Sequence, residues 1–87
     1  MEHIYIYNSR SIEENKLFKM MNLSNGNQKF YIIRKNKYSE IVENEILTEI
    51  DVNSEFAKFL LGAKINQIVK FPIKGKIHSF KIIQIFS

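Results

Sequence analysis

One nine-residue stretch, 54–62 (SEFAKFLLG), carries the clearest helix signals in this 87-residue chain. Ser54 is a residue type typical of N-caps, Glu55 places a negative charge at the positive end of the helix dipole, and Gly62 can adopt the left-handed conformation that ends a helix. Apolar side chains recur at the helical spacing i, i+3, i+4: Phe56, Phe59 and Leu60. Because a helix of about two turns is unstable alone in water, its apolar face must pack against a sheet.

Two apolar runs near the N-terminus predict a β-hairpin. Residues 16–23 and 28–34 are partly alternating, and the tetrapeptide SNGN separates them. The dipeptide Asn25-Gly26 suits turn positions with positive φ, which favours antiparallel pairing of the two runs.

A second pair of apolar runs, 68–73 and 77–86, follows the helix and predicts another hairpin, with Gly75 as the turn pivot. Pro72 has no amide hydrogen to donate, so it predicts a sheet edge or a bulge on its outward side. Period-two spacing places three side chains of the first run on one face: Val69, Phe71 and Ile73.

The last run changes its alternation part-way along. Phe80 and Ile82 share one face by period two, whereas Ile83 and Ile85 share the other. We expect a β-bulge with partial coverage of the second face, and coverage of both faces without a bulge is the alternative.

Two segments have weaker patterns. Residues 35–53 predict a loop followed by a strand near 46–52, and a helical turn around 39–45 is the alternative. Nearer the N-terminus, the sequence predicts a short strand at 4–7 and a turn of helix around 11–15.

The composition is that of a globular chain, with 45% hydrophobic residues, and its length predicts a single domain over residues 1–87. The absence of cysteine excludes a disulfide framework and a thiolate metal site, which favours a reducing compartment. No secretion signal and no run of about 18 apolar residues occurs, so the expected location is cytoplasmic.

The net charge of +4 is unevenly distributed along the chain. Residues 39–55 hold six acidic side chains and no basic one, whereas residues 56–87 hold six lysines and no acidic one. Such asymmetry can steer association with a charged partner, and a hydrated lysine surface that maintains solubility is the simpler interpretation. Direct nucleic-acid binding is a secondary alternative, because the C-terminal segment lacks arginines interleaved with exposed aromatics.

Catalytic patterns are scarce. His3 and His78 lie at opposite ends of the chain, and no HExxH spacing or nucleophile motif occurs. The three glycines lie far apart, so they form no phosphate-binding loop. The sequence therefore predicts no catalytic, cofactor-binding or metal-binding residues and a chain that is not an enzyme.

From 49 to 86 the sequence resembles the C-terminal domain of the bacterial Gre transcript-cleavage factors, GreA and GreB. That family shows a Ser-Pro-x-Ala-basic-x-Leu-x-Gly helix, then Lys-x-Gly-Asp with a valine strand, and Pro-Gly-Gly before a closing strand. The matching positions run without a gap from the helix to the last strand: Val52, Asn53, Ser54, Ala57, Lys58, Leu60, Leu61, Gly62, Lys64, Val69, Gly75, Phe80, Ile82, Ile83 and Ile85. Upstream, 17–23 and 30–33 resemble the family's first hairpin, so the resemblance covers the whole chain.

The resemblance implies an FKBP-like α+β fold, in which a strongly bent antiparallel sheet holds one short helix on its concave face. In the Gre family this domain docks on the largest subunit of RNA polymerase, at the rim of the secondary channel, and an N-terminal coiled coil holds the catalytic magnesium. The contact loop of the family corresponds by position to Asp51, Asn53, Ser54 and Glu55. Because these 87 residues hold no heptad run, the resemblance implies a stand-alone docking module that modulates transcription elongation without stimulating transcript cleavage.

Two other functional classes are alternatives. A small interaction module could bind another protein, or a second copy of itself through a sheet edge near Pro72. A prolyl isomerase or a direct nucleic-acid binder is the remaining alternative, although the chain has no tryptophan to line a proline pocket.

Overall fold

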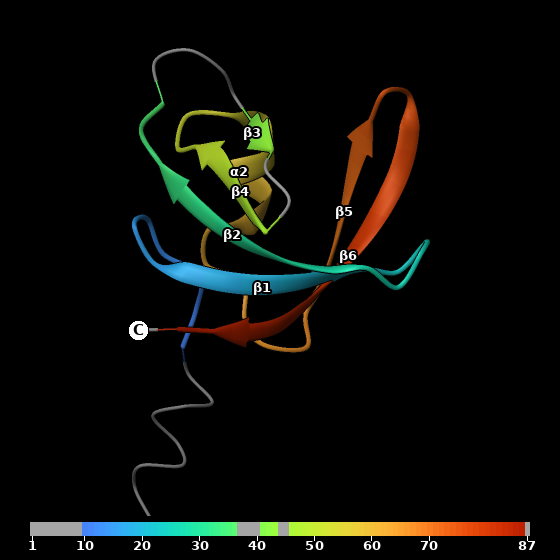
Figure 1. The fold of residues 1–87 in the computed structure, drawn as a ribbon, viewed down its shortest axis with the longest axis horizontal. Coiled ribbons are helices and arrows are strands. Elements are labelled where there is room, and N and C mark those ends of the chain that lie inside the picture. The colour runs from blue at the N-terminus through green and yellow to red at the C-terminus, as the bar shows by residue number, and fades with distance from the viewer. Residues whose placement is uncertain (1–9, 37–40, 44–45, 87) are drawn as a thin grey trace, which may run out of the picture.

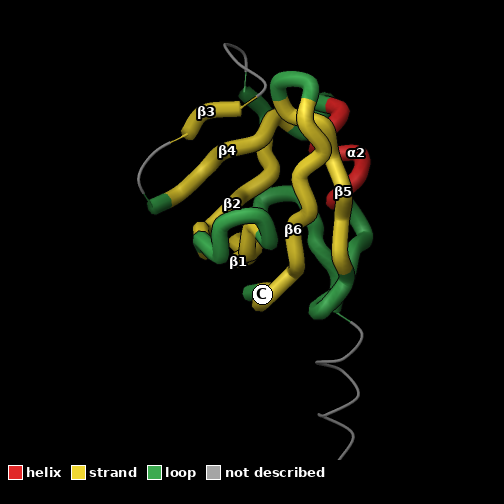
Figure 2. The backbone as a smooth tube through the Cα atoms, turned by 90° about the vertical axis from the view of Figure 1, so that its right-hand side faces the viewer, coloured by secondary structure: helices red, strands yellow, loops and turns green. Residues whose placement is uncertain are grey.

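The computed structural model describes residues 10–36, 41–43 and 46–86, which form one curled sheet and one short helix. The elements in chain order are β1 (Leu17–Asn22), β2 (Gln28–Arg34), β3 (Ile41–Glu43), β4 (Leu47–Asp51), α2 (Glu55–Leu60), β5 (Ile68–Ile73) and β6 (Lys76–Ile85). The strands form a single sheet in the order β3-β4-β2-β1-β6-β5. The sheet curls into an open half-barrel with α2 on its concave side (Figures 1 and 2), which confirms the α+β class, the bent sheet and the position of the helix.

The sheet is mixed, whereas the expected sheet was antiparallel throughout. Four strand pairs are antiparallel, but β2 and β4 run parallel, with Phe30 opposite Leu47 and Arg34 opposite Asp51. The reason is the position of β3, which lies at the sheet edge and pairs antiparallel with β4. After β2 the chain runs back along β3 and then reverses again into β4, which lies between β3 and β2. Two reversals give β4 the same direction as β2.

The hairpin between β1 and β2 is confirmed, with a loop over 23–27. The Asn22 amide donates to the Asn27 carbonyl at 2.8 Å, and the Gly26 amide donates to the Asn22 carbonyl at 2.8 Å. Of the expected pair Asn25-Gly26, only Gly26 has a positive φ, at 76°.

The hairpin between β5 and β6 closes through a two-residue loop. Lys74 and Gly75 both have positive φ, at 51° and 81°, which is the pattern of a type I′ turn. Pro72 lies on β5, which is an edge strand as its missing amide hydrogen predicted.

The expected bulge interrupts β6. Met20 pairs with Ile82 and Lys19 pairs with Gln84, so Ile83 is the extra residue. The bulge lets Ile85 return to the buried face that Phe80 and Ile82 occupy, and all three are buried.

The helix α2 is capped as its sequence predicted. The Ser54 Oγ accepts a hydrogen bond from the Ala57 amide at 3.2 Å, and Gly62 has a φ of 88° beyond the last turn. The predicted apolar face is wrong at one position. Phe59 is 49% exposed, and Ala57, which was not assigned to that face, is completely buried instead. The Phe59 ring instead contacts the ring of Phe71 edge-on, with centroids 5.3 Å apart.

The weaker predictions have mixed outcomes. The strand near 46–52 is confirmed as β4, but the alternative helical turn is wrong, because 41–43 form strand β3. The predicted helical turn at 11–15 is also wrong: Ser11 forms a β-bridge with Lys64, and Asn15 has a φ of 67°. The predicted strand at 4–7 lies outside the described residues.

The core lies between the concave face of the sheet and α2. Side chains that are almost completely buried come from the strands, the helix and the segment before β1: Ile12, Phe18, Met20, Ile33, Ile50, Leu60 and Ile82. Phe56 joins the helix to the β5–β6 hairpin, because its ring stacks on Phe71 at 4.5 Å and meets Phe80 at 5.4 Å.

Candidate docking groove

A groove of about 490 Å³ opens on the concave face, beyond the start of α2. One wall comes from β3 and β4, and the other comes from the tip of the β5–β6 hairpin. Apolar and aromatic side chains form its floor: Tyr31, Phe56, Ile73 and Phe80. Polar and charged side chains surround the floor: Asn22, Asn25, Asn27, Lys29, Glu43, Lys74 and Lys76.

Tyr31 is the most perturbed titratable group in the groove. Only 7% of its surface is exposed, and its ring stacks on Phe18 with centroids 5.7 Å apart. Burial, with a smaller effect from the negative charge of Glu43, raises the pKa of Tyr31 to about 12. The phenol is therefore neutral at pH 7 and keeps a proton to donate.

Two buried polar atoms of the groove have no hydrogen-bond partner within the described part of the chain. They are the Thr48 Oγ1, on β4, and the His78 Nδ1, on β6. Both atoms have almost no accessible surface, so a group in the groove can pair with them only after these side chains move, and leaving them unpaired costs the folded chain free energy.

The charges around the groove differ between its two walls. On one wall the Lys29 Nζ and the Glu43 Oε2 form an ion pair of 2.7 Å that joins β2 to β3. On the other wall Lys74 and Lys76 are exposed. One side of the groove is therefore close to neutral and the other side is positive.

The four predicted contact residues lie together at the turn into α2, and their side chains differ in exposure. Asp51 is half-buried and accepts hydrogen bonds from the Asn36 amide at 2.9 Å and the Asn53 amide at 3.3 Å. Ser54 is only 4% exposed and caps the helix. Asn53 and Glu55 are exposed, so they are the two members of this set whose side chains a partner can reach.

The turn and the groove are adjacent, because Phe56 follows Glu55 and lines the groove. Sequence patterns alone do not identify the groove residues, among them Lys29, Tyr31 and His78. Alternation along β2 and β6 places these side chains on one sheet face, but it does not show which strand lies opposite.

The described residues also lack two other kinds of site. Across 10–36, 41–43 and 46–86, no three His, Asp or Glu side chains are close enough together to hold a metal ion. Within the same residues, no helix has both the length and the apolar character needed to cross a membrane.

Comparison with known proteins gives similarity in structure only. No protein-family model and no curated protein sequence matches the chain. A solved structure of the transcription factor Gfh1 superposes with a TM-score of 0.72 at 13% identity, over 90% of this chain and 49% of that chain. The chain has the fold of about half of Gfh1. A crystal structure of GreA factor homolog 1 (Gfh1) from Thermus thermophilus agrees, with a TM-score of 0.72, 13% identity, and coverage of 91% and 50%.

Proposed function

We propose that this chain is a docking module that binds bacterial RNA polymerase, at the secondary-channel rim of the largest subunit, and modulates transcription without catalysing a reaction. The observation that carries the proposal is the concave groove next to the exposed turn into α2, on a fold shared with a transcription factor. Fold alone does not define function, so the local features of the groove are needed as well.

The groove suits a protein partner. It combines an apolar, aromatic floor with a polar rim, which is the usual composition of a protein-binding site. Ile41, which is 38% exposed, and the partly buried Ile73 line the groove and offer apolar surface to a side chain of the partner. Asn53 and Glu55 extend the contact surface beyond the groove.

The direct test is an equilibrium binding measurement between the labelled chain and purified bacterial RNA polymerase. We expect saturable binding that a full-length Gre factor displaces, because both would occupy the same rim. Absence of binding at low salt, or binding that a Gre factor does not displace, would overturn the proposal.

Charge reversals on one hairpin locate the contact. Lys76 lines the groove, whereas Lys70 lies on the opposite face of the same hairpin, and both are exposed. We expect Lys76→Glu to weaken polymerase binding about tenfold and Lys70→Glu to leave it nearly unchanged. Equal losses in the two variants would contradict docking through the groove.

The turn into α2 is tested without disturbing the helix cap. The double substitution of Asn53→Ala and Glu55→Ala removes two exposed side chains and keeps the capping Ser54. We expect weaker polymerase binding with unchanged thermal unfolding, and full binding by this variant would remove these residues from the contact surface.

A further inference from the structure

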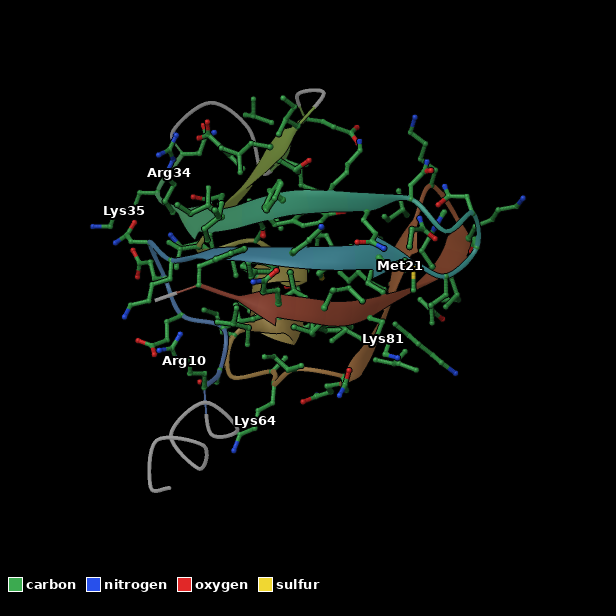
Figure 3. The ribbon with its side chains drawn as sticks, turned by 60° about the horizontal axis from the view of Figure 1, so that its bottom comes forward. Arg10, Met21, Arg34, Lys35, Lys64 and Lys81 are labelled. Atoms are coloured by element: carbon green, nitrogen blue, oxygen red, sulfur yellow. The ribbon has the colours of Figure 1, made fainter. Side chains whose placement is uncertain are left out.

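The convex face of the sheet has no layer of protein over it among the described residues. Figure 3 looks onto this face, where β2, β1 and β6 run side by side, and Figure 1 places α2 on the other side of the sheet. We call the outward-facing side chains of these three strands the outer face. Its members are Gln28, Phe30, Ile32 and Arg34 of β2, Leu17, Lys19 and Met21 of β1, and Ser79, Lys81 and Gln84 of β6.

Two aromatic rings lie together on the outer face. Phe30 and Phe86 have ring centroids 6.0 Å apart, and both side chains are only partly buried. The Lys19 ammonium lies 5.4 Å from the centroid of Phe30, since Lys19 is the cross-strand neighbour of that residue. Strand pairing thus places a lysine beside aromatic rings that are far away in the sequence.

The outer face belongs to a part of the sheet in which all the charged side chains are basic. The four adjacent strands β2, β1, β6 and β5 contain no Asp or Glu, whereas β3 and β4 contain Glu43, Glu49 and Asp51. Where the two parts meet, Arg34 binds Glu49 at 2.8 Å. Further basic side chains border the outer face in Figure 3: Arg10, Lys35 and Lys64.

We propose that the outer face binds single-stranded nucleic acid, with bases stacked on Phe30 and Phe86 and phosphates paired with Lys19 and Lys81. Aromatic rings beside lysines form the surface that single strands favour, because every base has a face to stack and every nucleotide carries a negative charge. A base on Phe30 displaces the Lys19 ammonium from the ring toward the phosphate. The amides of Gln28 and Gln84 are placed to hydrogen-bond base edges.

The positive charge of the outer face favours nucleic acid over a second copy of the chain as its binding partner. Two outer faces brought together would oppose lysine to lysine, which disfavours self-association. A phosphate backbone instead neutralises the lysines and releases counterions, so charge complementarity favours nucleic acid. This site lies on the opposite side of the sheet from the docking groove, and its test requires no polymerase.

The test measures binding of the full chain to a labelled oligothymidylate of about 15 nucleotides and to a duplex of equal length by fluorescence anisotropy. We expect saturable binding to the single strand that is tighter than binding to the duplex and that weakens steeply as salt is raised. Absence of saturable binding at low salt, or equal affinity for the duplex, would overturn the proposal.

Matched variants assign the site. We expect Phe30→Leu, which keeps an apolar side chain but removes the ring, to weaken single-strand binding by about fivefold or more. The double variant of Lys19→Gln and Lys81→Gln should lower the slope of log affinity against log salt by about 1.4, the value for two phosphates on a single strand. The control double variant, Lys74→Gln with Lys76→Gln, removes the same charge from the groove side and should lower binding far less.

Three outcomes would contradict the proposal. Equal losses in the two double variants would show that binding depends on net charge alone. Binding of an acidic polyglutamate peptide as tightly as the oligonucleotide would assign the face to an acidic protein. A dimer in sedimentation that Phe30→Leu dissociates would make the outer face a contact between two copies of the chain.

Discussion

The two faces of the central strands are made by alternate residues of the same segments, yet they have different surroundings. On β2, Ile33 points to the concave side and is completely buried, whereas its neighbour Ile32 points to the convex side and is only partly buried. The difference arises because α2 and the curl of the sheet cover one face and nothing among the described residues covers the other. A strand of a single curled layer therefore supplies core side chains on one face and partly exposed side chains on the other.

The concave face itself divides into a packed part and an open part. Beside α2 the side chains of Ile50, Leu60 and Ile82 are completely buried. Beyond Phe56 the short helix no longer fills the half-barrel, and the groove opens over Tyr31 and Phe80. The length of the helix thus determines where the core ends and the candidate docking site begins.

The largest expected effect tests the contrast within β2. We expect Ile33→Ala to lower the free energy of unfolding by about 2 to 5 kcal/mol, because it leaves a cavity in the core. Ile32→Ala removes the same atoms from the convex face and should cost only about 1 kcal/mol. Urea denaturation followed by circular dichroism measures both values, and similar losses would show that the two faces are equally buried.

The next effect concerns the buried phenol on the concave side. Because the folded chain holds the pKa of Tyr31 at about 12, above its usual 10.0, the folded state keeps this proton between those pH values while the unfolded state loses it. Its stabilising contribution is therefore complete below pH 10 and is lost as the pH rises to about 12, in total about 2 to 3 kcal/mol, because each pKa unit corresponds to about 1.4 kcal/mol. Urea denaturation at several pH values should show a smaller decline for Tyr31→Phe, and identical declines would indicate that the phenol is solvated.

A similar or smaller effect distinguishes the buried and exposed residues at the turn into α2. Ser54→Ala removes the cap of the first helical turn and should cost about 1 kcal/mol of unfolding free energy. Asn53→Ala, at the exposed neighbouring position, should change stability by less than about 0.5 kcal/mol. Thermal unfolding of both variants checks this order, and a larger loss for Asn53→Ala would reverse the roles of the two residues.

The smallest effect is expected on the outer face. Lys81→Gln should change the free energy of unfolding by less than about 0.5 kcal/mol, because the described structure shows no ion pair at Lys81 and the side chain is not fully buried. Urea denaturation measures this value. A loss of more than about 1 kcal/mol would mean that Lys81 has a structural role, and weaker binding by Lys81 variants would then reflect the loss of folded protein.

Local signals in the sequence predicted most of the regular elements. The cap at Ser54, the turn at Gly75 and the bulge at Ile83 each depend on a few neighbouring residues, and each is present in the structure. The same approach missed β3, which has three residues, and assigned Phe59 to the buried face in place of Ala57. A three-residue strand has almost no periodicity, and a small residue gives a weak hydrophobic signal even where it is completely buried.

The sequence by itself thus determined where five of the six strands, both hairpin turns and the helix lie, because caps, turn residues and alternation act over a few residues. Only the tertiary structure decided that β4 runs parallel to β2, that Lys29 meets Glu43 on one wall of the groove and that Lys19 lies over Phe30. These arrangements join residues that are distant along the chain, and the order of strands in the sheet sets which of them meet. Both proposed binding surfaces depend on that order, since each is built from side chains of several strands.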